Sequence, residues 1–470
     1  MRKIFTLMFV FLAITATRAE LSKYDLNAPM GWATCKSMTT SGDYNITGGG
    51  TGKSITLKAS GGDDYNALKN AISSYSVIIL DGSQGDFIIS KSMEIKASNR
   101  TIVGINNARL CTKFYVTPEI TKLMDDNNVK SLSTSSGTGG TLSNGVTVGE
   151  ARETKIRQLL IDYTGDTKES YRSSGIFSIK SCSNLIIRNI DFAGPGSIDV
   201  GGSDLVSISS SAHHIWVDHC QFTDGMDGNF DITNKADFVT VSWCVFKYTK
   251  RSYDHQNTNL IGGSDSASSQ GENNLNVTFA NNMWGELCNA RMPMARFGTI
   301  HLINNYYNCA GCGSPAMNPR KDSEFLIESN YFEKGVKNIF GQSSAKSYVF
   351  KNNHYTESFS QPADKGTVNI PYAYNTYDVK EVPAVVADAT NGAGPTLSDP
   401  LSIGRKDALE SPETKDYSYD GFVFRSTGKI SLFDLSGKCL KISENNLDMT
   451  VFSEGFYIVK TETAVVKIKR

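Results

Sequence analysis

Aromatic side chains recur along the middle of the chain at a nearly constant spacing. Each closes a short run of residues with the pattern of a strand, and the shortest interval between successive aromatics is 23 residues. The positions are Phe192, Phe222, Phe246, Trp284, Tyr307, Phe332 and Tyr355. A period in the twenties with one short strand per repeat predicts a solenoid, in which each coil packs on the next.

Asparagine occupies a second fixed position, two residues before four of these aromatics. The four are Asn282, Asn305, Asn330 and Asn353. Coils stacked about 4.8 Å apart would let each amide side chain bond to the next one along the stack. The pattern therefore predicts an all-β fold, a right-handed parallel β-helix. Leucine-rich repeats share the period but have a leucine signature that is absent here, and a β-sandwich would show turn signals every ~8–12 residues.

The repeat divides the chain into parts. The β-helix is predicted over residues 20–397, with a capping helix over residues 64–74 at its N-terminal end. Residues 398–417 are charged and contain proline, which indicates a linker. Short strand patterns over residues 418–470 predict a small C-terminal β-sandwich domain.

The first 19 residues have the pattern of a secretory signal. Arg2 and Lys3 precede a mostly apolar run, and the chain could be cut after Ala19. The alternative is a membrane anchor, but the run is too short to span a bilayer. We therefore expect a secreted protein, extracellular or at the cell surface, with no membrane span, and we expect a monomer. In such a protein, Cys309 and Cys312 predict a local disulfide, because a zinc site would need a second ligand pair.

The charge balance excludes one large class of partner. Lys and Arg number 47 and Asp and Glu number 48, so the formal net charge is −1. No overall field would attract a polyanion, and nothing indicates nucleic acid as a partner. An anionic partner would have to meet a local basic patch.

An acidic turn lies between two copies of one strand pattern, residues 215–222 and 239–246. Asp224, Asp227 and Asp231 are separated by glycines that allow a tight backbone. Asp–Gly clusters are most often plain turns. An EF-hand is excluded because no glutamate closes a twelve-residue loop here.

Several ordered motifs resemble family 1 polysaccharide lyases, the pectate lyases. They lie at residues 184–189, 216–219, 227–232, 239–243, 260–265 and 289–298. The resemblance covers about residues 60–397. It implies a parallel β-helix and calcium-dependent β-elimination of polygalacturonate (homogalacturonan), giving 4,5-unsaturated oligogalacturonides.

The resemblance also implies site residues. The family's metal ligands correspond to Asp204, Asp227 and Asp231, although the segment before His219 is one residue longer than usual. Calcium suits such carboxylates because it is a hard ion that prefers oxygen ligands. Without the resemblance, the same residues would be taken for a turn.

Two arginines complete the implied site. By resemblance Arg291 removes the C5 proton of the substrate and Arg296 binds the substrate. Arginine normally stays protonated, so this role requires nearby cations and partial desolvation. Alone, each arginine would be interpreted as the partner of a surface carboxylate, but the N-A-R-M-P-M-A-R sequence around them favours the catalytic interpretation.

The chain departs from the family at one position, where Asn257 stands in place of a substrate-binding lysine. A preceding insertion carries Lys247, Lys250 and Arg251. We expect Lys250 and Arg251 to supply the missing charge for substrate binding, although such a charge run is as often a solvated face.

The tail separately resembles the C-terminal sorting domain of type IX secretion cargo. The match rests on residues 435–438 and 455–460 and implies delivery by the type IX secretion machinery. An ordinary small β module, such as one that binds carbohydrate, is the alternative.

Three functions are consistent with the whole pattern. The first is a secreted pectate lyase. The second is a pectin lyase acting on methyl-esterified chains without calcium, against which the three aspartates argue. The third is a non-catalytic β-helix that binds pectin or acts as an adhesin. The combination of paired arginines and aspartates favours the enzyme.

Overall fold

The computed structural model describes residues 26–469 apart from 38–43, 134–136, 200, 342–343, 404–416, 420–421, 435–437, 454 and 462–464. Its contacts divide the chain into two compact units, residues 1–405 and 406–470. The proposed signal, residues 1–19, and most of the linker, together with residues 435–437 of the tail motif, lie outside the described residues. No helix in the described part of the chain is long and apolar enough to cross a membrane.

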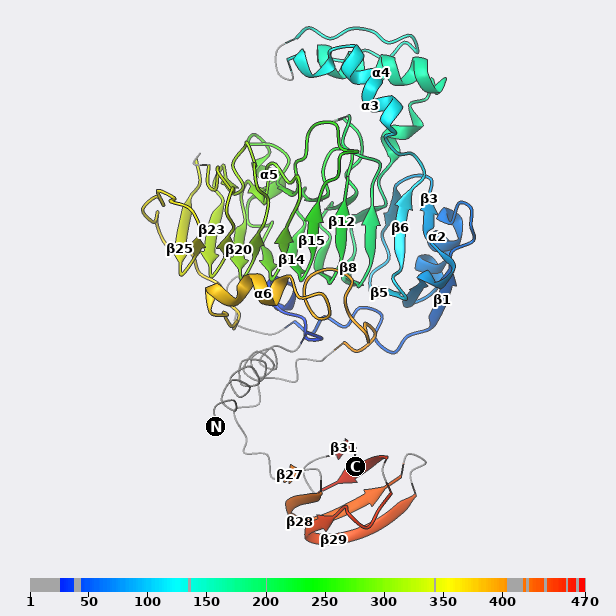
Figure 1. The fold of residues 1–470 in the computed structure, drawn as a ribbon, viewed down its shortest axis with the longest axis vertical. Helices are drawn as coiled ribbons and strands as arrows, with labels where there is room; N and C mark the ends of the chain where they lie inside the picture. Colours follow the sequence, from blue (N-terminus) through cyan, green and yellow to red (C-terminus); the bar gives the residue numbers. More distant parts are fainter. Residues whose placement is uncertain are drawn as a thin grey trace, which may run out of the picture. The chain divides into compact units, whose positions relative to one another are not determined.

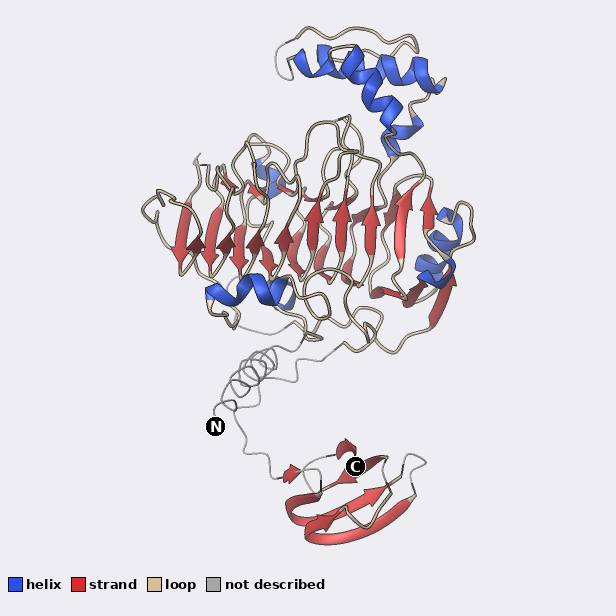
Figure 2. Cartoon of the chain, viewed as in Figure 1, coloured by secondary structure: helices blue, strands red, loops and turns tan. Residues whose placement is uncertain are grey.

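The first unit is a parallel β-helix built from three parallel sheets, as the repeat predicts (Figures 1 and 2). Its ten-stranded sheet has the order β1-β2-β5-β8-β11-β14-β17-β20-β23-β25. The strands are β1 (Ser54–Lys58), β2 (Val77–Asp81), β5 (Arg100–Ile105), β8 (Ser183–Arg188), β11 (His213–Asp218), β14 (Asp237–Ser242), β17 (Val277–Ala280), β20 (Thr299–Ile303), β23 (Glu324–Glu328) and β25 (Ser347–Lys351).

The nine-stranded sheet carries the aromatic positions. Its strands are β3 (Phe87–Ile89), β6 (Arg109–Thr112), β9 (Asp191–Ala193), β12 (Gln221–Thr223), β15 (Val245–Lys247), β18 (Met283–Trp284), β21 (Tyr306–Tyr307), β24 (Tyr331–Phe332) and β26 (His354–Tyr355). The seven-stranded sheet comprises β4 (Met93–Ile95), β7 (Phe177–Lys180), β10 (Val206–Ser209), β13 (Phe230–Ile232), β16 (Leu260–Ile261), β19 (Met294–Ala295) and β22 (Asn318–Pro319).

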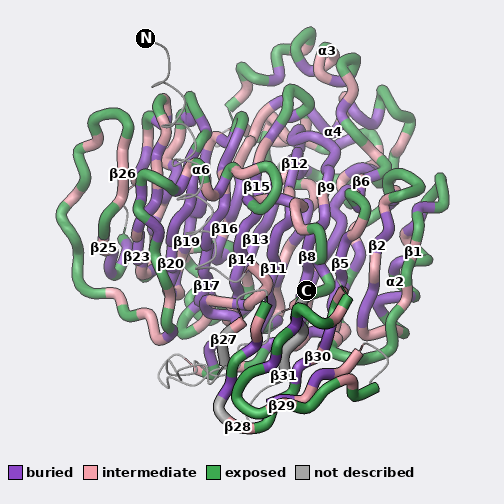
Figure 3. The backbone as a smooth tube through the Cα atoms, turned by 60° about the horizontal axis from the view of Figure 1, so that its bottom comes forward, coloured by how far each residue is buried: buried purple, intermediate pink, exposed green. Residues whose placement is uncertain are grey.

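The recurring aromatic side chains form a stack in the interior between the sheets. Phe192, Phe222 and Phe246 lie on successive coils, and their ring centroids are 5.0 and 5.2 Å apart in stacked pairs. The stack continues through the remaining four aromatics, ending with Phe332 and Tyr355 at 5.1 Å. Figure 3 shows the buried colour running along the inner strands from coil to coil. Stacking of the rings stabilises the fold beyond the burial of their apolar area. Aromatic residues at one repeated position therefore hold successive coils together.

The asparagine ladder is also confirmed. The side-chain amide of Asn282 donates to Oδ1 of Asn305 at 3.1 Å, and the amide of Asn305 donates to Oδ1 of Asn330 at 2.9 Å. Asn330 donates in turn to Asn353. Because the first three of these side chains are fully buried, the ladder satisfies polar groups that would otherwise be costly.

Helices lie outside the coils. Helix α2 (Tyr65–Ser74) buries Leu68 and Ile72 at the N-terminal end, as predicted. Helices α3 (Pro118–Asp126) and α4 (Ala151–Thr164) belong to a long insertion between β6 and β7 and stand beyond the coils (Figure 1). The shorter helices are α5 (Ser268–Gly271), α6 (Val382–Val386) and the 3-10 helices Gly31–Thr34, Gly82–Gln84, Val129–Ser131, Ser170–Ser173 and Val379–Glu381.

The second unit is a small antiparallel sheet with its own apolar cluster. Its strands are β27 (Tyr417–Tyr419), β28 (Val423–Phe433), β29 (Cys439–Asp448), β30 (Phe456–Lys460) and β31 (Val465–Lys469). Phe424, Leu432 and Val459 are buried within it. The C-terminal part is thus all-β, as predicted, but its described strands form one antiparallel sheet, whereas a β-sandwich would have two packed sheets.

One prediction about cysteine is wrong. Cys309 and Cys312 are free thiols and not a disulfide. Hydrogen bonding between the two thiols lowers the pKa of Cys312 to about 6 and raises the pKa of Cys309. Both thiols are buried.

Candidate active site

The candidate residues lie where the loops enter the seven-stranded sheet. Asp204 stands two residues before β10, Asp231 lies within β13, and Arg291 stands three residues before β19. Because these strands are parallel and pair in order along one sheet, their entry points line up on one face of the coils. Asn257 extends this alignment, since it forms parallel bridges with Gly228 on one side and Ala290 on the other.

Gly228 leaves a space between two carboxylates. A Cβ atom at this position would lie 3.0 Å from Oδ1 of Asp231 and 3.1 Å from Oδ1 of Asp204. The carbonyl oxygen of Asn257 would be 3.5 Å away. Three oxygen atoms therefore surround one point that any side chain at residue 228 would fill.

The electrostatics of this pair favour a bound cation. Burial, followed by the charges of Asp231 and Asp227, raises the pKa of Asp204 well above its usual range. Burial and then the charge of Asp227 raise the pKa of Asp231 from 3.8 to about 7. Such shifts mean that the ionised pair is costly until positive charge is brought near. The positive charge of Arg291 acts on both carboxyl groups in the opposite direction.

The donor set fits a hard divalent ion. Oδ1 of Asp204 is buried, and no described residue donates a hydrogen bond to it. Oδ1 of Asp231 accepts one bond, from the backbone N–H of Leu260 at 2.9 Å. Calcium takes six to eight oxygen ligands from carboxylates, carbonyls and water. Asp204, Asp231 and the Asn257 carbonyl could therefore hold it.

Asp227, the third predicted ligand, has a different partner. Its Oδ1 lies 3.0 Å from Nε2 of His255, and the side-chain amide of Asn257 also contacts the His255 ring. Among the residues that the structure describes, no three His, Cys, Asp or Glu side chains are grouped so as to hold a metal ion. Asp227 thus shares the acidic turn with Asp231, whereas Asp204 comes from the preceding coil, and the Asp227 carboxylate is paired with His255.

Arg291 is fixed by the coils on either side. Its carbonyl accepts from the N–H of Asn259 at 2.6 Å, and the following N–H, of Met292, donates to Ala316 at 2.6 Å. The Arg291 backbone has φ 57°, in the left-handed region that most residues adopt only at a cost. The Met292–Pro293 peptide bond that follows is cis. Hydrogen bonds from both neighbours maintain this conformation and keep the half-buried side chain near the carboxylates.

Arg296 is engaged elsewhere. Its Nε contacts Oδ1 of Asp265, and its Nη1 donates to the Gly262 carbonyl at 2.8 Å. Arg320 binds the other oxygen of Asp265 at 2.7 Å. With 11% of its side chain exposed, Arg296 is mostly committed to this network. The predicted contact of Arg296 with substrate would have to use the part of the guanidinium group that does not bind Asp265 or Gly262.

The sequence comparisons decide the family. A family model described as pectate lyase matches residues 149–396, more than half of the chain. The chain belongs to the pectate lyase family. The matched residues include Asp204, Asp231 and Arg291, so the cluster described above lies within the family segment.

Individual relatives agree. The chain is 37% identical over 175 residues to a probable pectate lyase B of Aspergillus terreus, which covers 36% of this chain and 50% of that protein. It is 32% identical over 228 residues to a probable pectate lyase A of Aspergillus niger, covering 47% of this chain and 65% of that protein. The chain therefore spans about half to two thirds of the length of these relatives.

Solved structures of pectate lyases are also similar. One from Bacillus sp. N165 in complex with trigalacturonate has 17% identity and a TM-score of 0.48, covering 78% of this chain and 99% of that chain. Pectate lyase II from Xanthomonas campestris has 20% identity and a TM-score of 0.46, covering 79% and 99%.

In this pectate lyase family member, the two predicted substrate-binding cations lie on the loop between β15 and β16. Lys250 and Arg251 are exposed, and the Arg251 guanidinium lies 5.3 Å from the ring centroid of Tyr115. They line a groove against the segment before α3. The loop that carries them ends at Asn257, beside the carboxylates.

Three residues that contribute to the candidate active site were not predicted from the sequence. His255 contacts Asp227, Gly228 creates the space between the carboxylates, and Tyr248 closes the loop by donating to the Asn257 carbonyl. Gly228 could have been found, because it is the glycine of the Asp-Gly pair in the acidic turn. His255 offers no signal in the sequence beyond being one of six histidines.

Asp224 does not face the carboxylate pair. Its oxygens accept from the N–H of Thr249 at 2.7 Å and from the hydroxyl of Ser252 at 2.8 Å. This extra aspartate of the acidic turn therefore anchors the start of the loop that carries Lys250 and Arg251.

Proposed function

We propose that this protein cleaves polygalacturonate by calcium-dependent β-elimination. The observation that carries the proposal is Arg291 near Asp231, which is buried, and Asp204, whose Oδ1 atom is buried, within the segment that matches the family. A divalent cation held by this carboxylate pair, together with the adjacent guanidinium group, would suit an acidic substrate better than a neutral one.

The reaction requires loss of the C5 proton of a uronate and departure of the C4 oxygen. Calcium, when bound, would neutralise the C6 carboxylate of the substrate and stabilise the negative charge that develops beside it. Asp204 and Asp231 would hold that ion, with the Asn257 carbonyl and, in our proposal, Asp227. Arg291 would accept the C5 proton, and the hydrogen bonds of its backbone to Asn259 hold it in position.

The substrate class follows from the charges. A calcium ion held by two or three aspartates would still take further oxygen ligands. A free C6 carboxylate would bind that ion more strongly than a neutral methyl ester, which offers only a weak carbonyl oxygen. We therefore expect polygalacturonate to be preferred over highly methylated pectin.

An ultraviolet assay for the unsaturated uronate product tests this function. We expect cleavage of polygalacturonate, loss of cleavage in chelator and recovery when calcium is added. Chelator-insensitive cleavage of highly esterified pectin would identify a pectin lyase instead. Tight binding of either polymer without cleavage would identify a non-catalytic pectin-binding protein.

We also propose that the protein is exported, with residues 1–19 as the signal and residues 418–470 as a type IX sorting domain. The sequence patterns at the two ends support this proposal. Deleting the residues after Tyr417 should spare the activity of the purified protein but prevent delivery in a host with type IX secretion. Normal delivery of the truncated protein would contradict it and favour a binding module.

A further inference from the structure

A groove separate from the carboxylate pair lies between the inserted helices and the β-helix. It has a volume of about 790 Å³. One wall is the segment from Tyr115 into α3, and the other is the loop Thr249–Arg251 together with Glu286. The residues from Tyr115 to Asp125 that form the first wall lie outside the segment 149–396 that matches the family.

The groove offers the groups that an acidic sugar needs. Tyr115 is 53% exposed and has Arg251 over its ring at 5.3 Å, while Lys250 is exposed on the same loop. An aromatic ring can pack against the apolar face of a sugar, and the cations can pair with a carboxylate. Asp125 and Glu286 also line the groove. Their oxygens can accept from sugar hydroxyls, and their charge disfavours a carboxylate at that end.

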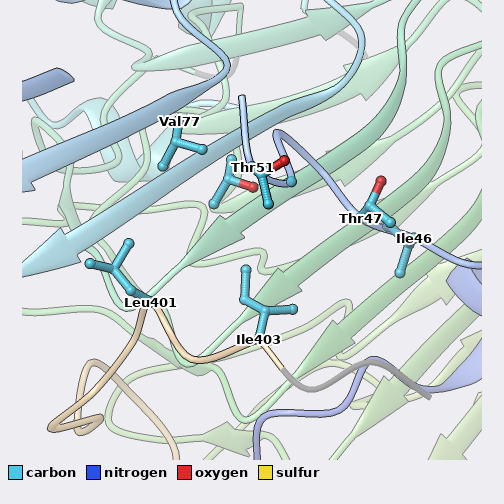
Figure 4. A pocket seen from close by; sticks show the side chains of 8 residues that line it. Ile46, Thr47, Thr51, Val77, Leu401 and Ile403 are labelled. Atoms are coloured by element: carbon cyan, nitrogen blue, oxygen red, sulfur yellow. The ribbon is translucent and has the colours of Figure 1, made fainter. Parts of the chain in front are cut away.

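A second pocket of the same unit lacks this chemistry. It has a volume of about 230 Å³ and lies between residues 46–51 and the segment at Leu401 and Ile403. Its side chains are aliphatic or threonine, and they carry no charge (Figure 4). Of these two pockets, the one at Tyr115 is suited to an anionic ligand.

The cationic wall is connected to the candidate active site by one short loop. At the start of the loop, Thr249 and Ser252 donate hydrogen bonds to Asp224, which lies in the same acidic turn as Asp227. At its end, the N–H groups of Thr258 and Asn259 donate to the carbonyls of Ala290 and Arg291 at 3.0 and 2.6 Å. A ligand in the groove therefore lies against the same loop that borders the carboxylates.

The inserted helices hold this loop in place. Tyr253 is buried in the cluster formed with Ile120 and Met124 of α3 and Leu160 of α4. Arg152 of α4 pairs with Asp254. These contacts come from an apolar cluster and an ion pair, so the groove is formed before any ligand binds.

We propose that this groove is an accessory site that binds a uronate residue of the polymer away from the point of cleavage. The sugar ring packs on Tyr115, and its carboxylate pairs with Lys250 and Arg251. The choice of uronate rests on the function proposed above, whereas the existence of an anion-selective sugar site rests on the groove. Such a site would retain long chains and favour them over short ones.

Calorimetry with oligogalacturonates of three and of ten or more residues tests this proposal. The full-length protein would carry Arg291→Ala to prevent cleavage, with calcium present. We expect Tyr115→Ala and Lys250→Ala each to weaken binding of the long oligomer by about threefold or more, and binding of the trimer less. Tyr163→Ala and Lys168→Ala are matched controls, because both residues are exposed on or near α4 and do not line the groove.

Two results would overturn the proposal. One is wild-type affinity for the long oligomer in both groove variants, with their thermal unfolding unchanged. The other is equal affinity for the fully methyl-esterified oligomer, which would show that no carboxylate is recognised. Neither depends on turnover, so failure of the lyase function would be seen separately, as absence of cleavage by the protein with Arg291 intact.

Discussion

Nε2 of His255 lies 3.0 Å from Oδ1 of Asp227, so a carboxylate expected to bind metal is held by a side chain from the next coil. His255 belongs to the loop between β15 and β16, which the inserted helices hold in place. The insertion therefore reaches the acidic turn through His255 and also through Met226, which is buried in the same apolar cluster as α3 and α4. Calcium would have to compete with His255 for Asp227 or bind without it.

Replacing His255 should strengthen calcium binding. In His255→Ala, Asp227 loses its partner and becomes free to act as a third carboxylate ligand. We expect the calcium dissociation constant, measured by calorimetry, to fall by roughly tenfold or more, since hydrogen bonds to charged groups are worth about 1.5–3 kcal/mol and about 1.4 kcal/mol corresponds to a factor of ten. Asp227→Asn should weaken binding in the same assay. Weaker binding in His255→Ala would mean that His255 orients Asp227 toward the ion.

Adding one methyl group at Gly228 should abolish cation binding. The Cβ of Gly228→Ala would occupy the point 3.0 and 3.1 Å from the two carboxylate oxygens. The expected result is loss of calcium binding and of activity, with the far-ultraviolet circular dichroism unchanged. Gly263→Ala is the matched control, because a Cβ there meets nothing within 4 Å. Full calcium affinity in Gly228→Ala would place the ion elsewhere.

The raised pKa of Asp231 makes stability depend on pH when calcium is absent. The pKa is about 7 in the folded protein and 3.8 ordinarily, so the folded state holds this proton more tightly than the unfolded state does. The resulting stability is fully present below about pH 4 and is lost as the pH rises through 7. In chelator, we expect the Tm of the wild type to fall by several degrees across this range relative to Asp231→Asn.

Calcium provides the control for this experiment. Because the ion binds the ionised carboxylates, adding it should restore the Tm most strongly near pH 7 and least near pH 4. A difference between wild type and Asp231→Asn that does not change from pH 4 to 7 would contradict the assignment of the raised pKa to Asp231.

The fold could be predicted because aromatic and asparagine residues recur in the sequence at a nearly constant spacing. Phe222 and Phe246 occupy the same position in successive repeats, and they are therefore neighbours in space. The same holds for Asn305 and Asn330. His219 and Arg188 also both contact Asp218 in the buried interior, where Asp218 accepts from Arg188 at 2.9 Å. A repeat needs no knowledge of distant contacts, since every coil meets only the next one.

The candidate site could be predicted only in part. Asp204, Asp231 and Arg291 lie together, and the family motifs named them, although their roles stay predictions. The contact of His255 with Asp227 depends on how a 12-residue loop closes, and that is decided by Tyr248 and by the helices packed on Tyr253. The groove depends on the contact between Tyr115 and Arg251. Most of the insertion and several coils separate these two residues in the sequence. Such contacts follow from tertiary packing, which no local pattern records.

Arg291 gives the most direct test of the proposed chemistry. Arg291→Ala should lower kcat on polygalacturonate by about 100-fold or more, the usual contribution of a positioned acid or base. Arg291→Lys keeps a positive charge but not the guanidinium geometry, so it should restore substrate binding better than it restores kcat. Both variants should still fold and bind calcium, because the backbone bonds of Arg291 to its neighbouring coils do not involve the side chain. Activity within a few-fold of the wild type in Arg291→Ala, with calcium still bound, would mean that another group takes the C5 proton.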